Sequence, residues 1–153
     1  MSAMRLRDFL APEAIKLDLA ATTREEVLRE LVALLRVSDT DAETLQRVLL
    51  RREGIGSTGV GRGIAIPHCR SLVVNNVRLA FGRHPAGLDY AAIDGRPVHH
   101  FFLILAPPLE VSNLYLPILG RIAQFAKDLD VPERLMQLQR PDDLLALLDE
   151  KGV

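Results

Sequence analysis

Hydrophobic and polar positions follow two patterns along the chain, and together they predict a mixture of helices and strands. In the first pattern, apolar side chains recur every three or four residues, which is typical of helices with one buried face. A threonine followed three residues later by a glutamate precedes two of these stretches, as in capping boxes at helix starts. Four helices are predicted: one after Thr23, one from about Thr40 to Gly54, one from about Ser112 to Leu129, and one from Pro141 to just before Gly152.

Shorter apolar segments, bounded by glycine, proline or polar residues, predict the strands. They are Ile15–Leu19, Ile64–Ile66, Val77–Phe81 and Val98–Leu105, and the last is expected to be buried on both faces. Helices and strands that alternate in this way predict an α/β fold with a sheet covered on both sides. No linker or internal repeat divides the chain, so a single domain over residues 1–153 is expected.

Composition narrows the class of protein. Charged residues make up 25% of the chain and the formal net charge is -1, which argues against a general nucleic-acid binder. Cys69 is the one cysteine, so no internal disulfide can form and a reducing compartment fits. The longest apolar run, Phe101–Ala106, is far shorter than the roughly 20 residues that a membrane-spanning helix needs. Because Met1–Leu10 also lacks a secretory signal, a cytoplasmic protein without membrane insertion is predicted.

A glycine-rich run leads directly to a histidine, from Gly54 to His68. Its first six residues match the dinucleotide pattern Gly-x-Gly-x-x-Gly, but here the glycines follow a predicted helix and precede a strand, which is the reverse of that motif. No acidic residue lies between Gly54 and Leu88 to bind a ribose. The nucleotide-hydrolase loop is excluded as well, because Val60 rather than lysine follows Gly59.

The same run has features that suit an anion. Glycines let backbone N–H groups approach a phosphate closely, and Ser57 and Thr58 add hydroxyl donors. The segment without acidic residues carries Arg62, Arg70, Arg78 and Arg83, and Arg52 lies just before it. Composition alone leaves two interpretations open, an anion-binding loop and a flexible surface loop.

His68 stands where the loop and the strand after it end. A neutral imidazole has its pKa near 6.5 and can attack phosphorus at cellular pH, giving a phosphoramidate that can pass the group onward. A structural histidine that bonds a nearby carbonyl is the alternative. Cys69 adjoins His68, but neighbours on an extended chain point to opposite faces, so Cys69 is expected to be a packed residue.

The remaining histidines do not predict a metal site. His99 and His100 are neighbours on a predicted strand, so their side chains are expected on opposite faces and cannot share one ion. His84 adjoins Pro85 and is interpreted as a loop residue. Neither a metal nor another cofactor is expected.

Several motifs resemble those of the fructose/mannitol-type enzyme IIA domains of the bacterial phosphotransferase system. The chain reads RE at 52–53, GSTG at 56–59, GIAIPH at 63–68 and IDGRPV at 93–98. The resemblance extends over nearly the whole chain and is strongest to the nitrogen-regulatory branch. It implies a three-layer α/β/α sandwich with a mixed sheet of about four to five strands.

The resemblance also implies roles for individual residues and partners. His68 would be the phosphoryl acceptor and form a tele-phosphohistidine, in which phosphorus is bonded to Nε2. Arg52, Ser57, Thr58 and Gly59 would bind the phosphate. A phosphocarrier protein of the HPr type would be the donor, and a regulated protein target or a IIB domain would be the acceptor.

One position departs from the pattern of this family. Many relatives have a second histidine at the start of the long helix, where this chain has Tyr115. A phenol can hydrogen-bond a phosphate or the His68 ring but cannot carry the positive charge of an imidazolium. Two alternatives to a regulatory phosphocarrier therefore stay open: a sugar-transport component that passes phosphate to a IIB domain, and a regulatory binding module that is not itself phosphorylated.

Overall fold

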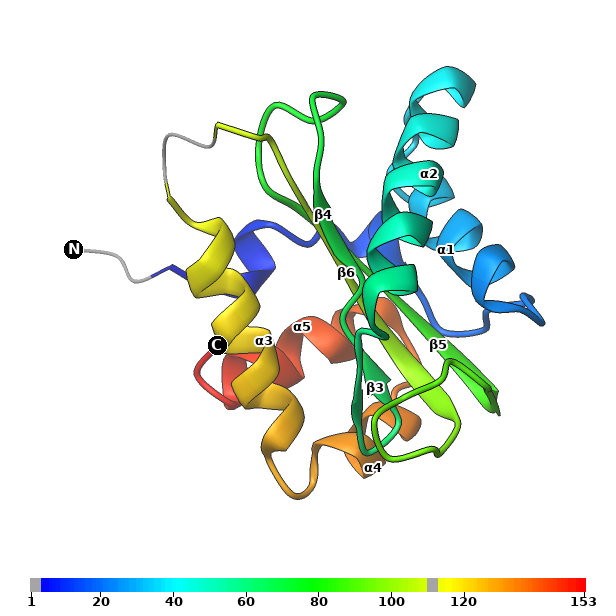
Figure 1. Ribbon diagram of the computed structural model, residues 1–153. Coiled ribbons are helices and arrows are strands. Elements are labelled where there is room, and N and C mark those ends of the chain that lie inside the picture. The colour runs from blue at the N-terminus through cyan, green and yellow to red at the C-terminus, as the bar shows by residue number, and fades with distance from the viewer. Residues whose placement is uncertain (1–3, 110–112) are drawn as a thin grey trace.

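The computed structural model describes residues 4–109 and 113–153, and in it a mixed sheet lies between two groups of helices (Figure 1). Helices α1 (Arg24–Ala33) and α2 (Asp39–Ile55) cover one face. The other face is covered by α3 (Tyr115–Lys127), α4 (Val131–Met136) and α5 (Pro141–Glu150). This arrangement confirms the predicted three layers. None of the helices within the described residues is both long and apolar enough to cross a membrane.

The sheet has six strands in the described residues rather than the four to five expected. They are β1 (Ile15–Lys16), β2 (Gly59–Gly61), β3 (Ile64–Ala65), β4 (His68–Arg70), β5 (Arg78–Leu88) and β6 (Val98–Ala106). Their order is β1-β5-β6-β3-β2, and β4 pairs with β6 beyond the end of β3. β5 is antiparallel to β6, whereas β3 and β4 are both parallel to it. The two unexpected strands are β2, inside the glycine run, and β4, which follows Pro67.

Strand β6 is the centre of the hydrophobic core. Its residues from His100 to Ala106 are all buried, as predicted for a strand covered on both faces. Aromatic rings link the layers: Phe102 packs against Phe81 of β5 with ring centroids 4.8 Å apart, and edge-on against Phe125 of α3. This packing fixes the position of β6, and therefore of the short strands that pair with it.

The helix ends agree with the sequence in part. Thr23 caps α1 by accepting the Glu26 N–H, as the capping box predicts. The second helix begins at Asp39, in agreement with the predicted start near Thr40, and Ser38 is its cap. It continues one residue past the predicted stop at Gly54, to Ile55. A glycine inside a helix costs about 1 kcal/mol but does not end it.

Three further predictions about the fold need correction or cannot be compared. The expected start of the long helix at Ser112 lies outside the described residues. The helix predicted to run to Leu129 already ends at Lys127, and Leu129 is 90% exposed. His84 lies in β5 rather than in a loop, at a register shift between Arg83 and Leu88. Pro85 is tolerated there because the shifted residues make no ladder pairs that need its missing N–H.

Candidate functional site

The site is built on an interruption between β3 and β4. Both strands pair with β6, but Pro67 between them has no N–H and cannot continue the ladder as a donor. The Ile66 N–H instead donates to the Thr58 carbonyl at 3.0 Å, and the Pro67 carbonyl accepts the Ile104 N–H at 3.0 Å. The interruption is therefore held by hydrogen bonds on both sides, and the Ile66 carbonyl is available to accept a hydrogen bond from a side chain.

That side chain is the imidazole of His68. Its Nδ1 lies 2.6 Å from the Ile66 carbonyl oxygen. Because a carbonyl can only accept, Nδ1 must carry the proton, and the Nε2 lone pair is then available. His68 is half-buried, and no described residue forms a hydrogen bond with Nε2. The carbonyl bond expected of a structural histidine is present, but it also leaves the other nitrogen ready to act as a nucleophile.

Tyr115 and Arg70 lie beside His68. Residues 68 and 70 point to the same face of β4, and α3 begins over that face with Tyr115. The Tyr115 ring centroid is 6.3 Å from that of His68. The Arg70 guanidinium carbon is 4.4 Å from the same Tyr115 centroid, which is cation–π geometry. The structure therefore places Tyr115 next to His68, which the sequence alone does not show.

Titration of the neighbouring groups follows from their burial. Burial, together with Cys69, raises the pKa of Tyr115 to about 12, against the opposing charges of Arg70 and Arg52. Tyr115 is thus a neutral phenol at cellular pH. Burial also raises the pKa of the Cys69 thiol to about 12, so this cysteine is not a thiolate nucleophile. Cys69 is buried, as predicted for a residue on the face opposite His68.

Arg52 approaches from the C-terminal end of α2. Its Nη1 donates to the Gly56 carbonyl at 2.8 Å, and its charge acts on the Tyr115 hydroxyl. Two guanidinium groups, those of Arg52 and Arg70, therefore lie near one phenol that is itself beside His68.

The donors of the glycine loop are engaged within the protein. The Ser57 hydroxyl donates to the Tyr90 carbonyl at 2.7 Å and accepts the Gly59 N–H at 3.0 Å. The Thr58 N–H and hydroxyl both donate to the Glu53 carboxylate. A direct contact of Ser57, Thr58 or Gly59 with a phosphate would require one of these bonds to break.

Glu53 is a residue that sequence reasoning missed. It is only 3% exposed, and its carboxylate holds Thr58, whose carbonyl in turn holds Ile66. A continuous chain of hydrogen bonds thus runs from Glu53 through two backbone units to His68 Nδ1. The only signal in the sequence is the position of Glu53 directly after Arg52.

Three of the arginines thought to surround an anion do not reach the site. Arg62 donates to the Ala126, Asp128 and Leu129 carbonyls, and so caps the C-terminal end of α3. Arg78 does the same for the end of α1 through the Leu35 carbonyl. Arg83 donates to the carbonyls of Leu135 and Met136, in the last turn of α4, and of Leu138 just beyond it. Their charges stabilise helix ends instead of a bound phosphate.

The other histidines lie away from this site. His100 is buried and His99 is half-buried at the neighbouring position of β6. Their ring centroids are only 6.1 Å apart, so the wide divergence expected from strand alternation is not found. Among the described residues, no three or more His, Cys, Asp or Glu side chains form a group that could hold a metal ion.

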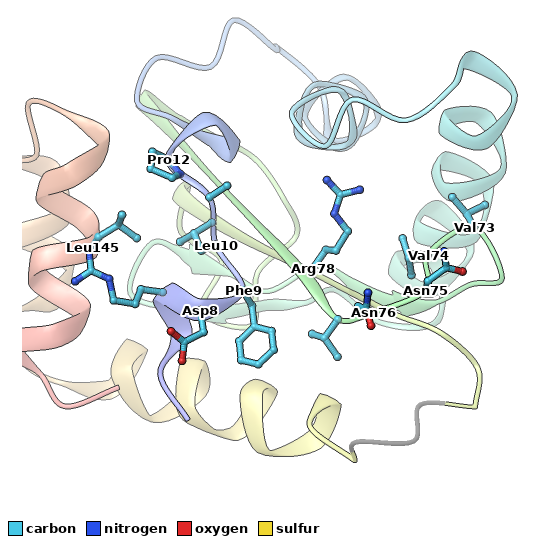
Figure 2. A pocket seen from close by; sticks show the side chains of 13 residues that line it. Asp8, Phe9, Leu10, Pro12, Val73, Val74, Asn75, Asn76, Arg78 and Leu145 are labelled. Atoms are coloured by element: carbon cyan, nitrogen blue, oxygen red, sulfur yellow. The ribbon is translucent and has the colours of Figure 1, made fainter. Parts of the chain in front are cut away.

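A cavity of about 720 Å³ lies elsewhere, between the N-terminal segment and the loop that follows β4 (Figure 2). Phe9, Val73 and Arg78 are among the residues that line it, and His68 is not.

Comparisons with known proteins agree with this geometry. Residues 8–151 match the family described as "Phosphoenolpyruvate-dependent sugar phosphotransferase system, EIIA 2". A nitrogen regulatory protein from Bradyrhizobium diazoefficiens is 35% identical over 133 residues, which cover 86% of this chain and 86% of that protein. The fructose-specific EIIABC component of Bacillus subtilis is 31% identical over 96% of this chain, but the chain spans only 23% of the length of that relative.

Solved structures show the same fold. The nitrogen regulatory protein IIA-Ntr from Neisseria meningitidis superimposes with a TM-score of 0.84 at 28% identity, over 92% of this chain and 97% of that one. The resemblance in sequence motifs, the layered fold and the match over residues 8–151 all lead to one assignment. The chain belongs to the EIIA type 2 family of the phosphotransferase system, a family of phosphoryl-transfer components, and has nitrogen regulatory proteins among its relatives.

Proposed function

We propose that this protein is a phosphocarrier that accepts a phosphoryl group on Nε2 of His68 and uses its phosphorylation state for regulation. The observation that carries the proposal is the bond from His68 Nδ1 to the Ile66 carbonyl, which fixes the tautomer and leaves the Nε2 lone pair unbonded. Nucleophilic catalysis by histidine needs this combination of a neutral ring and an accessible nitrogen.

The proposed step balances without a cofactor. The Nε2 lone pair attacks the phosphorus of the donor's phosphohistidine, and a new P–N bond forms as the donor's P–N bond breaks. The electron pair of the broken bond remains on the donor's ring nitrogen. The His68 Nδ1–H remains hydrogen-bonded to the Ile66 carbonyl, and this bond stabilises the positive charge that the ring gains on phosphorylation. Positioning and charge supply the rest of the catalysis.

Arg52 is proposed to neutralise the phosphate, since its guanidinium ends near Tyr115 and the site carries no acidic partner for it among the described residues. Direct phosphate contacts from Ser57, Thr58 and Gly59 stay a prediction. The bonds that these residues make support a role in fixing the loop between Arg52 and β3.

The partners belong to the proposal as well. An HPr-type phosphocarrier is the proposed donor, and the acceptor is either a regulated protein target or, in the alternative reading, a IIB domain. The nitrogen regulatory relative, matched over 86% of its length, favours regulation, whereas the fructose-specific relative favours sugar transport. We place the protein in the cytoplasm, as one domain over residues 1–153 that binds no nucleic acid.

The test is phosphorylation followed by intact-protein mass. The protein is incubated with a phosphorylated HPr-type protein and, separately, with phosphoramidate, a small phosphoryl donor that has no docking surface. One phosphoryl group should be gained, and NMR of the ¹⁵N-labelled imidazole should place it on Nε2. The gain should be lost in His68→Ala and retained in His99→Ala, a matched control for the loss of another half-buried histidine.

Two outcomes would contradict the proposal. A phosphoryl gain that survives His68→Ala would move the acceptor elsewhere. No gain from either donor would favour the regulatory module that is not phosphorylated, and binding of a partner that is unchanged in His68→Ala would then support that alternative.

A further inference from the structure

Arg70 is held in a fixed place by two contacts. Its guanidinium lies over the face of the Tyr115 ring, with the guanidinium carbon 4.4 Å from the centroid. Its Nη1 also donates to the Pro107 carbonyl at 3.1 Å. Both contacts keep the charge on the face of β4 to which His68 also points.

We propose that Arg70, held against the Tyr115 ring, is a charge-supplying residue that stabilises the phosphoryl group entering and leaving His68. The proposal rests on His68 being the phosphoryl acceptor, as proposed above. It assigns to Tyr115 a positioning role, since the phenol orients the guanidinium and carries no charge of its own.

The charges around the site support this role. A phosphoryl group on a histidine carries close to two negative charges, which one guanidinium, that of Arg52, compensates only in part. Tyr115 is neutral, so it contributes no positive charge to the site. Arg52 and Arg70 form no ion pair within the described residues, so the charge of each is available to an incoming anion. Arg70 bonds a neutral carbonyl that it can exchange for a phosphate oxygen.

This arrangement differs in its pH dependence from one that relies on a second histidine. A guanidinium stays charged throughout the range in which proteins work, whereas an imidazolium loses its proton near pH 6.5. The transfer rate of the native protein should therefore not fall between pH 6.5 and 9 through loss of a positive charge beside His68.

The experiment measures the rate of phosphorylation by phosphoramidate and by a phosphorylated HPr-type protein. Arg70→Ala should be phosphorylated roughly tenfold more slowly by both phosphoryl donors. This decrease in rate is smaller than that expected for removing a fully enclosed hydrogen-bond donor, because Arg70 is exposed to solvent. Arg70→Lys should recover part of the rate, because it restores a positive charge without the planar group. Arg29→Ala, which removes an exposed arginine from α1, should match the native rate and controls for net charge.

A second variant separates charge from structure. Arg70→Ala combined with Tyr115→His should be faster than Arg70→Ala at pH 6, and this gain should disappear by pH 8 as the new imidazole loses its proton. A merely structural role of Arg70 would not produce a gain that depends on pH. Circular dichroism and urea unfolding of each variant check that it is folded.

The proposal is overturned if Arg70→Ala is phosphorylated at the native rate by both donors. It is also overturned if the variant is slower only with the protein donor, since Arg70 would then serve docking rather than charge stabilisation. If the native protein itself gains no phosphoryl group, the failure lies in the proposed function, so the two results are distinguishable.

Discussion

The bond between Thr58 and Glu53 offers a sharp test of how the site is held. Thr58→Val replaces the hydroxyl by a methyl group of nearly the same size, so no cavity is created. It leaves one oxygen of a carboxylate without its donor in a place where Thr58 is 4% and Glu53 3% exposed. The Thr58 N–H continues to donate to the other carboxylate oxygen at 2.9 Å.

The size of the effect follows from burial and charge. A hydrogen bond to a charged group contributes about 1.5 to 3 kcal/mol, and an unsatisfied buried acceptor loses its full solvation. We therefore expect Thr58→Val to lower the free energy of unfolding by about 2 to 3 kcal/mol. For a chain of this length, such a loss lowers the melting temperature by about 4 to 12 °C.

Urea unfolding followed by circular dichroism measures the difference. Thr44→Val is a matched control, because the Thr44 hydroxyl only bonds back to the Thr40 carbonyl within α2, where its loss should cost less than about 0.5 kcal/mol. Glu53→Gln should cost less than Thr58→Val, since an amide can still accept the Thr58 N–H and donate to its hydroxyl. If Thr58→Val is no more harmful than the Thr44 control, the Glu53 carboxylate does not hold the loop.

The same variant tests the path from Glu53 to His68. Thr58 also accepts the Ile66 N–H, and Ile66 holds His68 Nδ1. Loosening Thr58 should therefore slow phosphorylation of His68 under conditions where the variant is still folded. An unchanged rate together with reduced stability would show that the hydrogen-bond chain stabilises the fold without positioning the imidazole.

Three further predictions concern the fold around the site. Burial, followed by the charges of His99 and Arg83, lowers the pKa of His100 to about 3. Between pH 3 and 6.5 the unfolded chain therefore binds a proton at this residue that the folded protein does not. The free energy of unfolding of the native protein, relative to that of His100→Gln, should fall by about 2 kcal/mol from pH 7 to pH 5, as measured by urea unfolding. Gly59→Ala should destabilise by about 1 to 3 kcal/mol, because the added Cβ would lie 2.9 Å from the Ala92 Cα; a neutral result in thermal unfolding would contradict this close approach. Arg62→Lys should cost about 1 to 2 kcal/mol in thermal unfolding, because lysine cannot reach all three carbonyls at the C-terminal end of α3 at once. An unchanged melting temperature would contradict the assignment of Arg62 as a helix cap.

Local signals in the sequence were sufficient for several features. The Thr23 capping box fixed the start of α1, and the apolar segment after Val98 correctly indicated a strand buried on both faces. Alternation along a strand correctly separated the buried Cys69 from the half-buried His68. These features depend on the backbone geometry of single elements, which is why short stretches of sequence reveal them.

Local signals were wrong where packing overrides them. Strand β5 continued past Phe81 to Leu88, because its pairing with β6 outweighs the local preference of the residues around Pro85. The cluster of arginines around an acid-free segment predicted one anion site, yet three of them bond to carbonyls at the ends of separate helices.

The residues alone reveal which chemistry is available: a histidine after proline at the end of a glycine run, flanked by basic residues. The folded arrangement sets which of those basic residues lie near the histidine, and it brings the Tyr115 ring close to both His68 and Arg70. Periodicity specifies on which side of its own helix or strand a residue lies. Which elements become neighbours is set by packing between residues far apart in the chain, as between Arg62 and Ala126, 64 positions away, and no local pattern encodes that.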